Sequence, residues 1–259
     1  MPPLHIAFRN GRQKLTVGQV PLVVGTLSSL AGKFPPPRQK VDCDVVEVRL
    51  DKTGPPPDWL ERCREIQDRG WPVLLTIRLK NEGGAWNDGD ARRLPLFEQG
   101  LYELAGADVE WRSNIVHRVA ILAKRLRKIC VISYHDLNKT PPAEKLAAII
   151  LEAQKLASIV KIATRLNNPA DEATLRLLLA HRWKRPLCLI GMGPAWTHTR
   201  LSFPQLGSCL TYGYLDKPAA PGQMPAAELA RQLRAQKPPA VNTQQSKPMV
   251  RQSYNSVVS

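Results

Sequence analysis

Two side chains able to carry out covalent and proton-transfer chemistry stand in neighbouring apolar runs of the sequence. His135 lies near the end of the run 131–137, and Lys161 lies within the run 158–164. Burial disfavours the charged form of a lysine, so its pKa falls and its amine becomes a nucleophile toward a carbonyl group. A histidine beside it can transfer protons near neutral pH. From this pair alone a second interpretation is equally open, in which the lysine snorkels at a strand end and the histidine only caps a strand.

The segments around this pair predict how the two side chains meet. Residues 143–155 have a helical pattern, so the region 131–164 is a strand–helix–strand unit. In a parallel sheet both strands run the same way, and both side chains reach one pocket at the carboxyl edge. The same alternation recurs along the chain. Strands are predicted at 21–27, 45–51, 72–78, 107–110, 131–137, 158–164, 186–192 and 209–215, and further helices at 59–68, 92–105, 114–127, 172–181 and 226–233.

Roughly eight strands alternating with helices favour an α/β fold of the closed (β/α)8 barrel type, the TIM barrel. Residues 4–17 predict a β-hairpin with a two-residue turn at Asn10-Gly11, and this hairpin would plug the bottom of the barrel. We expect one barrel domain over residues 1–235, with residues 1–19 as the hairpin cap. Residues 236–259 lack apolar periodicity and are expected to form a disordered polar tail.

Composition limits the class of protein further. The chain has 259 residues, 43% of them hydrophobic, which is enough for a full core. No apolar run approaches the roughly 20 residues of a membrane span, and the N-terminus lacks the pattern of a signal peptide. The five cysteines have no close metal-type spacing. We therefore expect buried, reduced thiols in a cytoplasmic protein, with no metal site and no membrane association.

The formal net charge of +15 is unusual, and it suits nucleic acid, an acidic membrane surface or an anionic metabolite. The basic residues are spread over predicted helices and loops, and the densest group, 124–128, falls at a predicted helix end, where cations favour the helix dipole. A scattered distribution of this kind is typical of a solvated surface. The sequence therefore predicts no nucleic-acid partner.

Polar residues also follow the other predicted strands, at the edge where His135 and Lys161 are expected. Glu47 and Arg49 lie in the second strand, Arg78 ends the third, and Glu82 is in the loop after it. Guanidinium groups pair with carboxylates in a two-pronged geometry, so arginines at several strand ends suit an anionic, oxygen-rich substrate.

Six short motifs in these positions together resemble type I 3-dehydroquinate dehydratase, the Schiff-base enzyme of the shikimate pathway. Each motif alone is weak, but they follow the family order over about residues 20 to 233. The motifs are Glu47-Val48-Arg49, Thr76-Ile77-Arg78 with Glu82-Gly83-Gly84, Ser133-Tyr134-His135-Asp136, Val160-Lys161-Ile162-Ala163, Met192-Gly193 leading to Thr199-Arg200, and Ala220-Pro221-Gly222-Gln223.

The resemblance implies a lyase that removes water from 3-dehydroquinate in the syn sense to give 3-dehydroshikimate, on the route to chorismate and the aromatic amino acids. Lys161 would form an imine with the substrate ketone, and the protonated imine would act as the electron sink. His135 would be the general base and acid, and Glu82 would orient it. The imine replaces a metal, so no cofactor is expected. A homodimer is also implied.

The same resemblance assigns the substrate-binding residues. Arg200 and Gln223 would hold the substrate carboxylate, Glu47 and Arg78 would bind ring hydroxyls, and Arg49 would support them. The chain departs from the family pattern where the usual lid serine is Ala219, a change that removes a substrate contact. Thr199 replaces a serine before the late arginine. In the same loop the bulky Trp196 and His198 could alter the pocket.

Two other functions remain open at the level of the sequence. A Schiff-base aldolase acting on another keto substrate would use Lys161 and a barrel equally well. A basic barrel that has lost activity and binds RNA or a protein partner would fit the charge, the tail and Ala219. The presence of both His135 and Lys161 argues against the second alternative.

Overall fold

Short runs rich in valine, isoleucine and leucine form a parallel sheet whose strands are buried on both faces. The computed structural model describes residues 3–31, 43–220 and 222–235. Its eight-stranded sheet has the order β10-β3-β4-β5-β6-β7-β8-β9, and all neighbouring pairs are parallel. The strands are β3 (Leu22–Leu27), β4 (Val45–Arg49), β5 (Val73–Thr76), β6 (Gly106–Glu110), β7 (Ile129–Asp136), β8 (Ile159–Arg165), β9 (Leu187–Met192) and β10 (Leu210–Tyr214).

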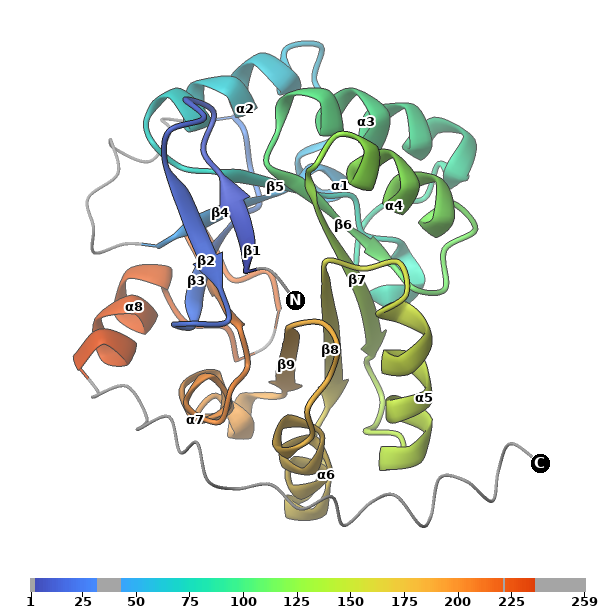
Figure 1. The fold of residues 1–259 in the computed structure, drawn as a ribbon, viewed down its shortest axis with the longest axis vertical. Coiled ribbons are helices and arrows are strands. Elements are labelled where there is room, and N and C mark those ends of the chain that lie inside the picture. Colours follow the sequence, from blue (N-terminus) through green and yellow to red (C-terminus); the bar gives the residue numbers. More distant parts are fainter. Residues whose placement is uncertain (1–2, 32–42, 221, 236–259) are drawn as a thin grey trace.

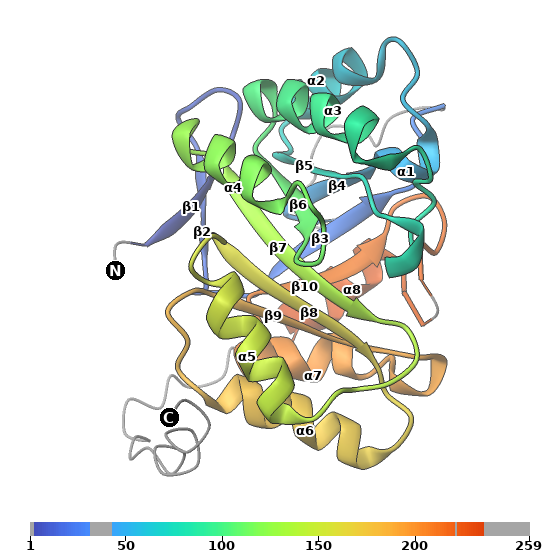
Figure 2. The same cartoon turned by 90° about the vertical axis from the view of Figure 1, so that its right-hand side faces the viewer.

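The two end strands of this order lie side by side, so the sheet curls into a nearly closed barrel. The main-chain N–H of Cys209, just before β10, donates to the carbonyl oxygen of Leu187 in β9 at 2.9 Å. Helices cover the outside of the strands (Figure 1 and Figure 2). The prediction of a (β/α)8 barrel is confirmed.

The helices bury one apolar face each against the strands. In α4, Val116, Val119, Ala120 and Ala123 are buried, whereas Arg118 and Arg125 on the opposite face are exposed. The α-helices are α1 (Leu50–Thr53), α2 (Trp59–Asp68), α3 (Gly89–Glu103), α4 (Val116–Arg125), α5 (Ala143–Ala153), α6 (Pro169–Ala180), α7 (Thr199–Gln205) and α8 (Ala226–Ala235), and the 3-10 helices are η1 (Lys80–Glu82) and η2 (Pro194–Trp196). In the described part of the chain, none of them has the length and apolar character that crossing a bilayer requires.

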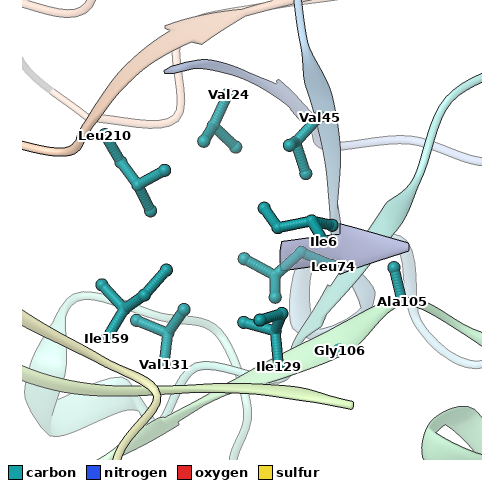
Figure 3. A pocket seen from close by; sticks show the side chains of 10 residues that line it. All are labelled: Ile6, Val24, Val45, Leu74, Ala105, Gly106, Ile129, Val131, Ile159 and Leu210. Carbon is teal, nitrogen blue, oxygen red and sulfur yellow. The ribbon is translucent and has the colours of Figure 1, made fainter. Parts of the chain in front are cut away.

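The N-terminal hairpin consists of β1 (Leu4–Ala7) and β2 (Lys14–Val17), which pair antiparallel. The side chain of Ile6 is only 4% exposed, because it lies among aliphatic side chains from the amino ends of the barrel strands. Figure 3 shows Ile6 beside a small space lined by residues such as Val24, Leu74 and Ile159. This space has only apolar walls and offers no group for chemistry. The hairpin thus covers the bottom of the barrel, as predicted.

The structure corrects several expected boundaries. The hairpin loop spans residues 8–13, because strand pairing ends at Ala7 and Lys14, so the two-residue turn predicted at Asn10-Gly11 is wrong. The Asn10 side chain instead accepts from the main-chain N–H groups of Arg12 and Gln13. The second barrel strand ends at Arg49 and not at Asp51, since α1 begins at Leu50.

Two α-helices escaped prediction: α1, whose first two residues were assigned to the second strand, and α7. The helix α7 is seven residues long and contains Pro204, so its sequence lacks a clear helical period. The expected disordered tail, residues 236–259, lies outside the described residues. All five cysteines are free and buried, as expected.

Candidate active site

Inward-facing positions change from aliphatic to polar along most strands of the barrel, whereas β9 stays apolar with Ile190 and Met192 at the pocket. In β8, Ile159 lies at the amino end, and Lys161 follows it on the same face because strand side chains alternate. Ser133 of β7 pairs in register with Lys161, and His135 pairs with Ala163. On β7, His135 therefore lies two residues nearer the carboxyl edge of the sheet than Ser133, the residue opposite Lys161. The half of the barrel at the amino ends of the strands is a packed core, and the half at their carboxyl ends can hold a ligand.

All eight residues predicted for the site line one pocket of about 610 Å³, open to solvent at the carboxyl edge. Glu47, Arg78, Glu82, Lys161 and Arg200 are each at most 5% exposed. The further lining residues come from the sheet and from the segments after β5, β7 and β10. The eight predicted residues that line the pocket are Glu47, Arg49, Arg78, Glu82, His135, Lys161, Arg200 and Gln223.

Lys161 is a buried cation with a buried partner that sequence reasoning missed. Its Nζ lies 3.0 Å from Oδ2 of Asp108 in β6 and 3.9 Å from the ring centre of Tyr212 in β10. Burial alone would raise the pKa of the Asp108 carboxyl, but the charges of Arg78 and Lys161 outweigh burial and hold it well below its usual range. The side chain of Lys161 is thus fixed between a carboxylate and an aromatic face.

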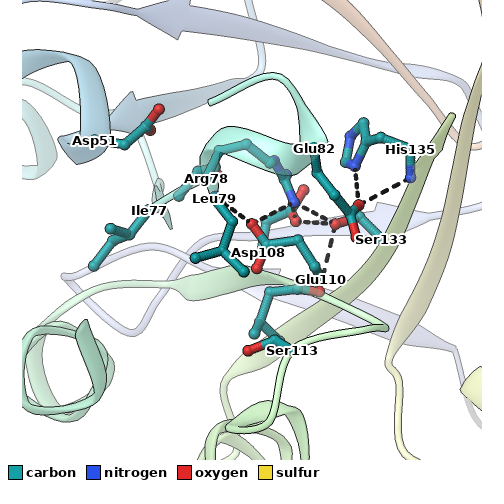
Figure 4. Close-up of polar contacts among 12 residues, drawn as sticks. Asp51, Ile77, Arg78, Leu79, Glu82, Asp108, Glu110, Ser113, Ser133 and His135 are labelled. Carbon is teal, nitrogen blue, oxygen red and sulfur yellow. Dashed lines mark hydrogen bonds and ion pairs between the residues drawn. The ribbon is translucent and has the colours of Figure 1, made fainter. Parts of the chain in front are cut away.

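Arg78 joins this pair into a network of buried charges (Figure 4). Its Nη2 donates to Oδ1 of Asp108 at 2.7 Å, and its Nη1 donates to Oγ of Ser133 at 2.7 Å. Nη1 also lies 3.2 Å from Oε1 of Glu110. The carboxylates of Asp108 and Glu110 raise the pKa of Arg78 against the opposing effect of burial. Because every member has a partner, the network holds the pocket wall rigid.

His135 is oriented by Glu82 across the pocket edge. Oε2 of Glu82 accepts from the main-chain N–H of His135 at 3.0 Å and lies 3.0 Å from its Nδ1. Burial lowers the pKa of His135 well below 6.5, and the charges of Arg78 and Lys161 add to this effect while Asp108 opposes it. The imidazole is therefore neutral at pH 7. Since an ionised carboxylate only accepts, the ring proton lies on Nδ1, and Nε2 is the basic nitrogen.

The loop that carries Glu82 depends on two glycines. Helix η1 ends at Gly83, whose φ of +81° favours glycine. A Cβ at Gly84 would collide with the main-chain carbonyl group of Arg78. The loop therefore folds tightly back on the end of β5, where the N–H of Trp86 donates to the carbonyl oxygen of Arg78 at 3.1 Å. This turn directs Glu82 toward His135.

Glu47 and Arg49 do not pair with each other. The two carboxylate oxygens of Glu47 accept from Oγ1 of Thr26 at 3.0 Å and of Thr76 at 2.8 Å. Arg49 makes a two-pronged pair with Asp51 at 2.9 and 2.7 Å. Both predicted binding residues are thus held by neighbours to which the sequence analysis gave no role.

Arg200, in α7, is a buried cation without a buried anion beside it. Its Nε donates to the carbonyl oxygen of Gly222 at 2.9 Å and its Nη1 to that of Tyr212 at 2.9 Å. Burial lowers the pKa of Arg200 to about 10, so the group stays charged at neutral pH. No carboxylate within the described residues forms an ion pair with it. The remaining N–H donors of this guanidinium suit an anionic group in the pocket.

Gln223 ties the last loop to the barrel. Its Oε1 accepts from the N–H of Ala219 at 2.7 Å, and its Nε2 donates to Oγ1 of Thr26 at 3.3 Å. Ala219 lines the pocket and offers no hydroxyl group.

The other residues noted in the loop after β9 lie away from the pocket lining. Thr199 is buried and donates to the carbonyl oxygen of Trp196 at 2.7 Å. His198 is paired with Glu172 at 3.2 Å, and its ring lies 5.8 Å from that of Trp196. The expected effect of Trp196 and His198 on the pocket is therefore not direct, because neither lines it.

Sequence reasoning also gave no role to four further charged or polar partners of the site: Asp108, Glu110, Arg112 and Ser133. A signal for two of them was present, since Asp108 and Glu110 stand at alternate positions of a short buried strand, Gly106–Glu110. Two carboxylates on one face of a buried strand require partners or a functional role. Arg112, two residues beyond that strand, gave no comparable signal.

Comparison with known proteins agrees with this geometry. The family model described as type I 3-dehydroquinase matches residues 19–238. A 3-dehydroquinate dehydratase from Methanocella arvoryzae is 37% identical over 193 residues, 74% of this chain and 86% of the relative. The solved 3-dehydroquinate dehydratase of Aquifex aeolicus is 27% identical with a TM-score of 0.69, covering 82% of this chain and 97% of that one. The type I enzyme of Clostridium difficile, at 22% identity, shares the fold with a TM-score of 0.76 over 90% of this chain and 97% of that one. Since the family model spans most of the sequence, this chain belongs to the type I 3-dehydroquinase family.

Proposed function

We propose that this chain dehydrates 3-dehydroquinate to 3-dehydroshikimate in the shikimate pathway through an imine on Lys161. The observation that carries the proposal is the pairing of a buried amine with a neutral, buried imidazole on neighbouring strands. The family of the chain supports the choice of substrate. Both groups line the pocket that also contains the cation of Arg200.

The first stage is imine formation. The Lys161 ammonium must lose a proton before its nitrogen can attack, and the neutral imidazole of His135 can accept that proton. Nζ then bonds to the ketone carbon, and the former carbonyl oxygen takes one proton from Nζ to give a hydroxyl group. His135 returns its proton to this hydroxyl group, which departs as water and leaves the protonated imine. The Asp108 carboxylate beside Nζ stabilises the positive charge of the resulting iminium.

The second stage is elimination. Nε2 of His135 removes a proton from the carbon next to the iminium carbon, and the electron pair flows to nitrogen to give an enamine. The C–O bond to the hydroxyl group on the following carbon then breaks, the enamine electrons form the new double bond, and the imidazolium gives its proton to the departing hydroxide. Water finally adds to the iminium, which releases 3-dehydroshikimate and regenerates Lys161. Glu82 keeps Nε2 as the basic nitrogen throughout.

The remaining lining residues fit the substrate. Arg200 and Gln223 would bind the carboxylate, while Glu47 and Arg78 would bind ring hydroxyl groups and Arg49 would support them. Each carboxylate oxygen of Glu47 accepts one bond from a threonine, which leaves room for a substrate donor. Ala219 supplies no side-chain donor, so the carboxylate would depend more strongly on Arg200.

Replacing Arg200 by lysine is expected to raise KM about 10- to 100-fold, because a hydrogen bond to a charged group contributes roughly 1.5–3 kcal/mol. kcat should change less, since Arg200 does not touch the groups that transfer protons. The measurement is steady-state kinetics, with Arg176→Lys as a matched control on the exposed face of α6. An unchanged KM would contradict the role of Arg200 in binding the carboxylate.

The test of the proposed function is the absorbance of the product enone after the purified chain is mixed with 3-dehydroquinate. The substrate has an isolated ketone, whereas the product has a double bond conjugated to it, so turnover appears as a rise in absorbance. A folded protein that gives no rise would contradict the dehydratase. Adduct formation with a different keto substrate would then favour the aldolase alternative.

We further propose three properties: a homodimer, which the family resemblance implies, and a cytoplasmic location and a single domain over residues 1–235, which the cysteine usage and the strand–helix pattern favour. Light scattering tests the first, since a dimer has twice the chain mass of 28.9 kDa. Fractionation of cells tests the second. Limited proteolysis tests the third, because cleavage should be confined to residues beyond 235.

A further inference from the structure

Arg112 contacts two groups of the site although it does not line the pocket. It lies two residues after β6, and its side chain is 47% exposed. Its Nε donates to Oε1 of Glu82 at 3.0 Å, and its Nη2 donates to the main-chain carbonyl oxygen of His135 at 2.7 Å. One guanidinium therefore links the carboxylate that orients the imidazole to the backbone that carries it.

Glu82 and Arg112 hold the backbone of His135 at both its N–H and its carbonyl group. Oε2 of Glu82 accepts a hydrogen bond from the main-chain N–H of His135 and another from its Nδ1. The guanidinium of Arg112 donates to the main-chain carbonyl oxygen of His135. Since Oε1 of Glu82 is bound by Arg112, both carboxylate oxygens have fixed positions. Loss of Arg112 would free Oε1 and let the carboxylate rotate away from Nδ1.

A buried aromatic ring fixes Arg112 in turn. The guanidinium carbon lies 4.8 Å from the ring centre of Tyr134, which is 5% exposed. Contact with an aromatic face stabilises a guanidinium and restricts its orientation. The half-exposed arginine is thus held in one orientation over the edge of the pocket.

The charges around Glu82 make this contact important. Burial raises the pKa of Glu82, while the charges of Arg78 and Arg112 and the bond from Arg112 oppose that rise, and Glu110 adds to it. Arg78 is already committed to Asp108 and Glu110. His135 is the other titratable group in contact with Glu82. The charged groups that act on its imidazole are Arg78, Lys161, Asp108 and Arg49. Arg112 is therefore the cation in direct contact with Glu82.

We propose that Arg112 is a positioning residue of the reaction, which clamps Glu82 against the Nδ1 edge of His135 and so directs Nε2 toward the substrate. This inference rests on the proposed function, because it concerns the base of the dehydration. Arg112 touches no substrate and acts through its two neighbours.

The test compares Arg112→Gln with Arg118→Gln. Arg118 is an exposed arginine of α4, 3.5 Å from Glu98, so its replacement removes the same charge without touching the site. We expect Arg112→Gln to lower kcat about 10-fold with KM within about twofold. Because loss of the Arg112 cation leaves the negative charge of Glu82 less compensated beside Nδ1, the pKa of His135 should rise, and the acid limb of kcat/KM that His135 sets should move to higher pH. Arg112→Lys restores the charge, so the acid limb of this variant's pH profile should return toward that of the wild type.

The outcomes separate the inference from the proposed function. Absence of turnover by the wild type would overturn both. Turnover by the wild type, with Arg112→Gln matching Arg118→Gln in kcat and in its acid limb, would overturn the inference alone. A rise in KM without a change in kcat would also overturn it, because it would make Arg112 a binding residue. Circular dichroism verifies that each variant is folded.

Discussion

Replacing Lys161 by alanine is expected to lower kcat by at least about 10⁴-fold, because no imine can form and the electron sink is lost. The fold should survive. Asp108 keeps the 2.7 Å bond from Arg78 and the 2.6 Å bond from Ser133, so removing the lysine leaves no unpaired buried carboxylate. The measurement is turnover of 3-dehydroquinate by the purified variant at neutral pH.

The matched control for this prediction is Lys155→Ala. Lys155 follows α5, and its exposed side chain pairs with Glu152 at 2.6 Å, far from the pocket lining. Its replacement should leave kcat and KM near those of the wild type. A Lys161→Ala enzyme that keeps kcat within tenfold of the wild type would contradict the covalent mechanism.

Replacing His135 by alanine is expected to lower kcat about 10²- to 10⁴-fold, the usual range for a general acid or base. In the wild type the base must be neutral, and activity is lost as pH falls through its pKa. Burial and the charges of Arg78 and Lys161 place that pKa well below 6.5. The acid limb of kcat/KM should therefore lie below pH 6.5, and activity should be constant from pH 6.5 to 7.

The variant should also lose this acid limb, because the group that titrates is gone. His117→Ala, on the exposed face of α4, serves as the control and should keep both kcat and the pH profile. A wild-type acid limb centred at or above pH 6.5 would show that the imidazole is not held neutral by its surroundings. A limb that persists in His135→Ala would assign the titration to another group.

The barrel and six of the eight predicted pocket residues were accessible from the sequence for a physical reason, whereas Arg200 and Gln223 came from the family resemblance. Buried parallel strands are continuous apolar runs, so a single polar side chain such as Lys161 stands out within one. Residues at the carboxyl ends of successive strands meet at one edge, and the topology alone brings Glu47, Arg78 and His135 together. Side-chain roles, by contrast, do not follow from position.

The partners of those residues could not be predicted in the same way. Asp108 and Lys161 are 53 positions apart, as are Glu82 and His135, and no local pattern relates such pairs. Arg112 is one among 37 lysines and arginines, so nothing in its sequence position set it apart. Helix α7 was missed because seven residues with an internal proline give no helical period. The sequence thus locates the reacting groups, and the three-dimensional contacts reveal what holds them.

The most direct test of the imine is the mass of the intact protein after incubation with 3-dehydroquinate and 3-dehydroshikimate in the presence of borohydride. Reduction converts an imine into a stable amine, so a covalent adduct is expected, and peptide mapping should assign it to Lys161. The adduct should be absent from Lys161→Ala and present in Lys155→Ala. No adduct on a folded protein, or an adduct on another lysine, would contradict the account.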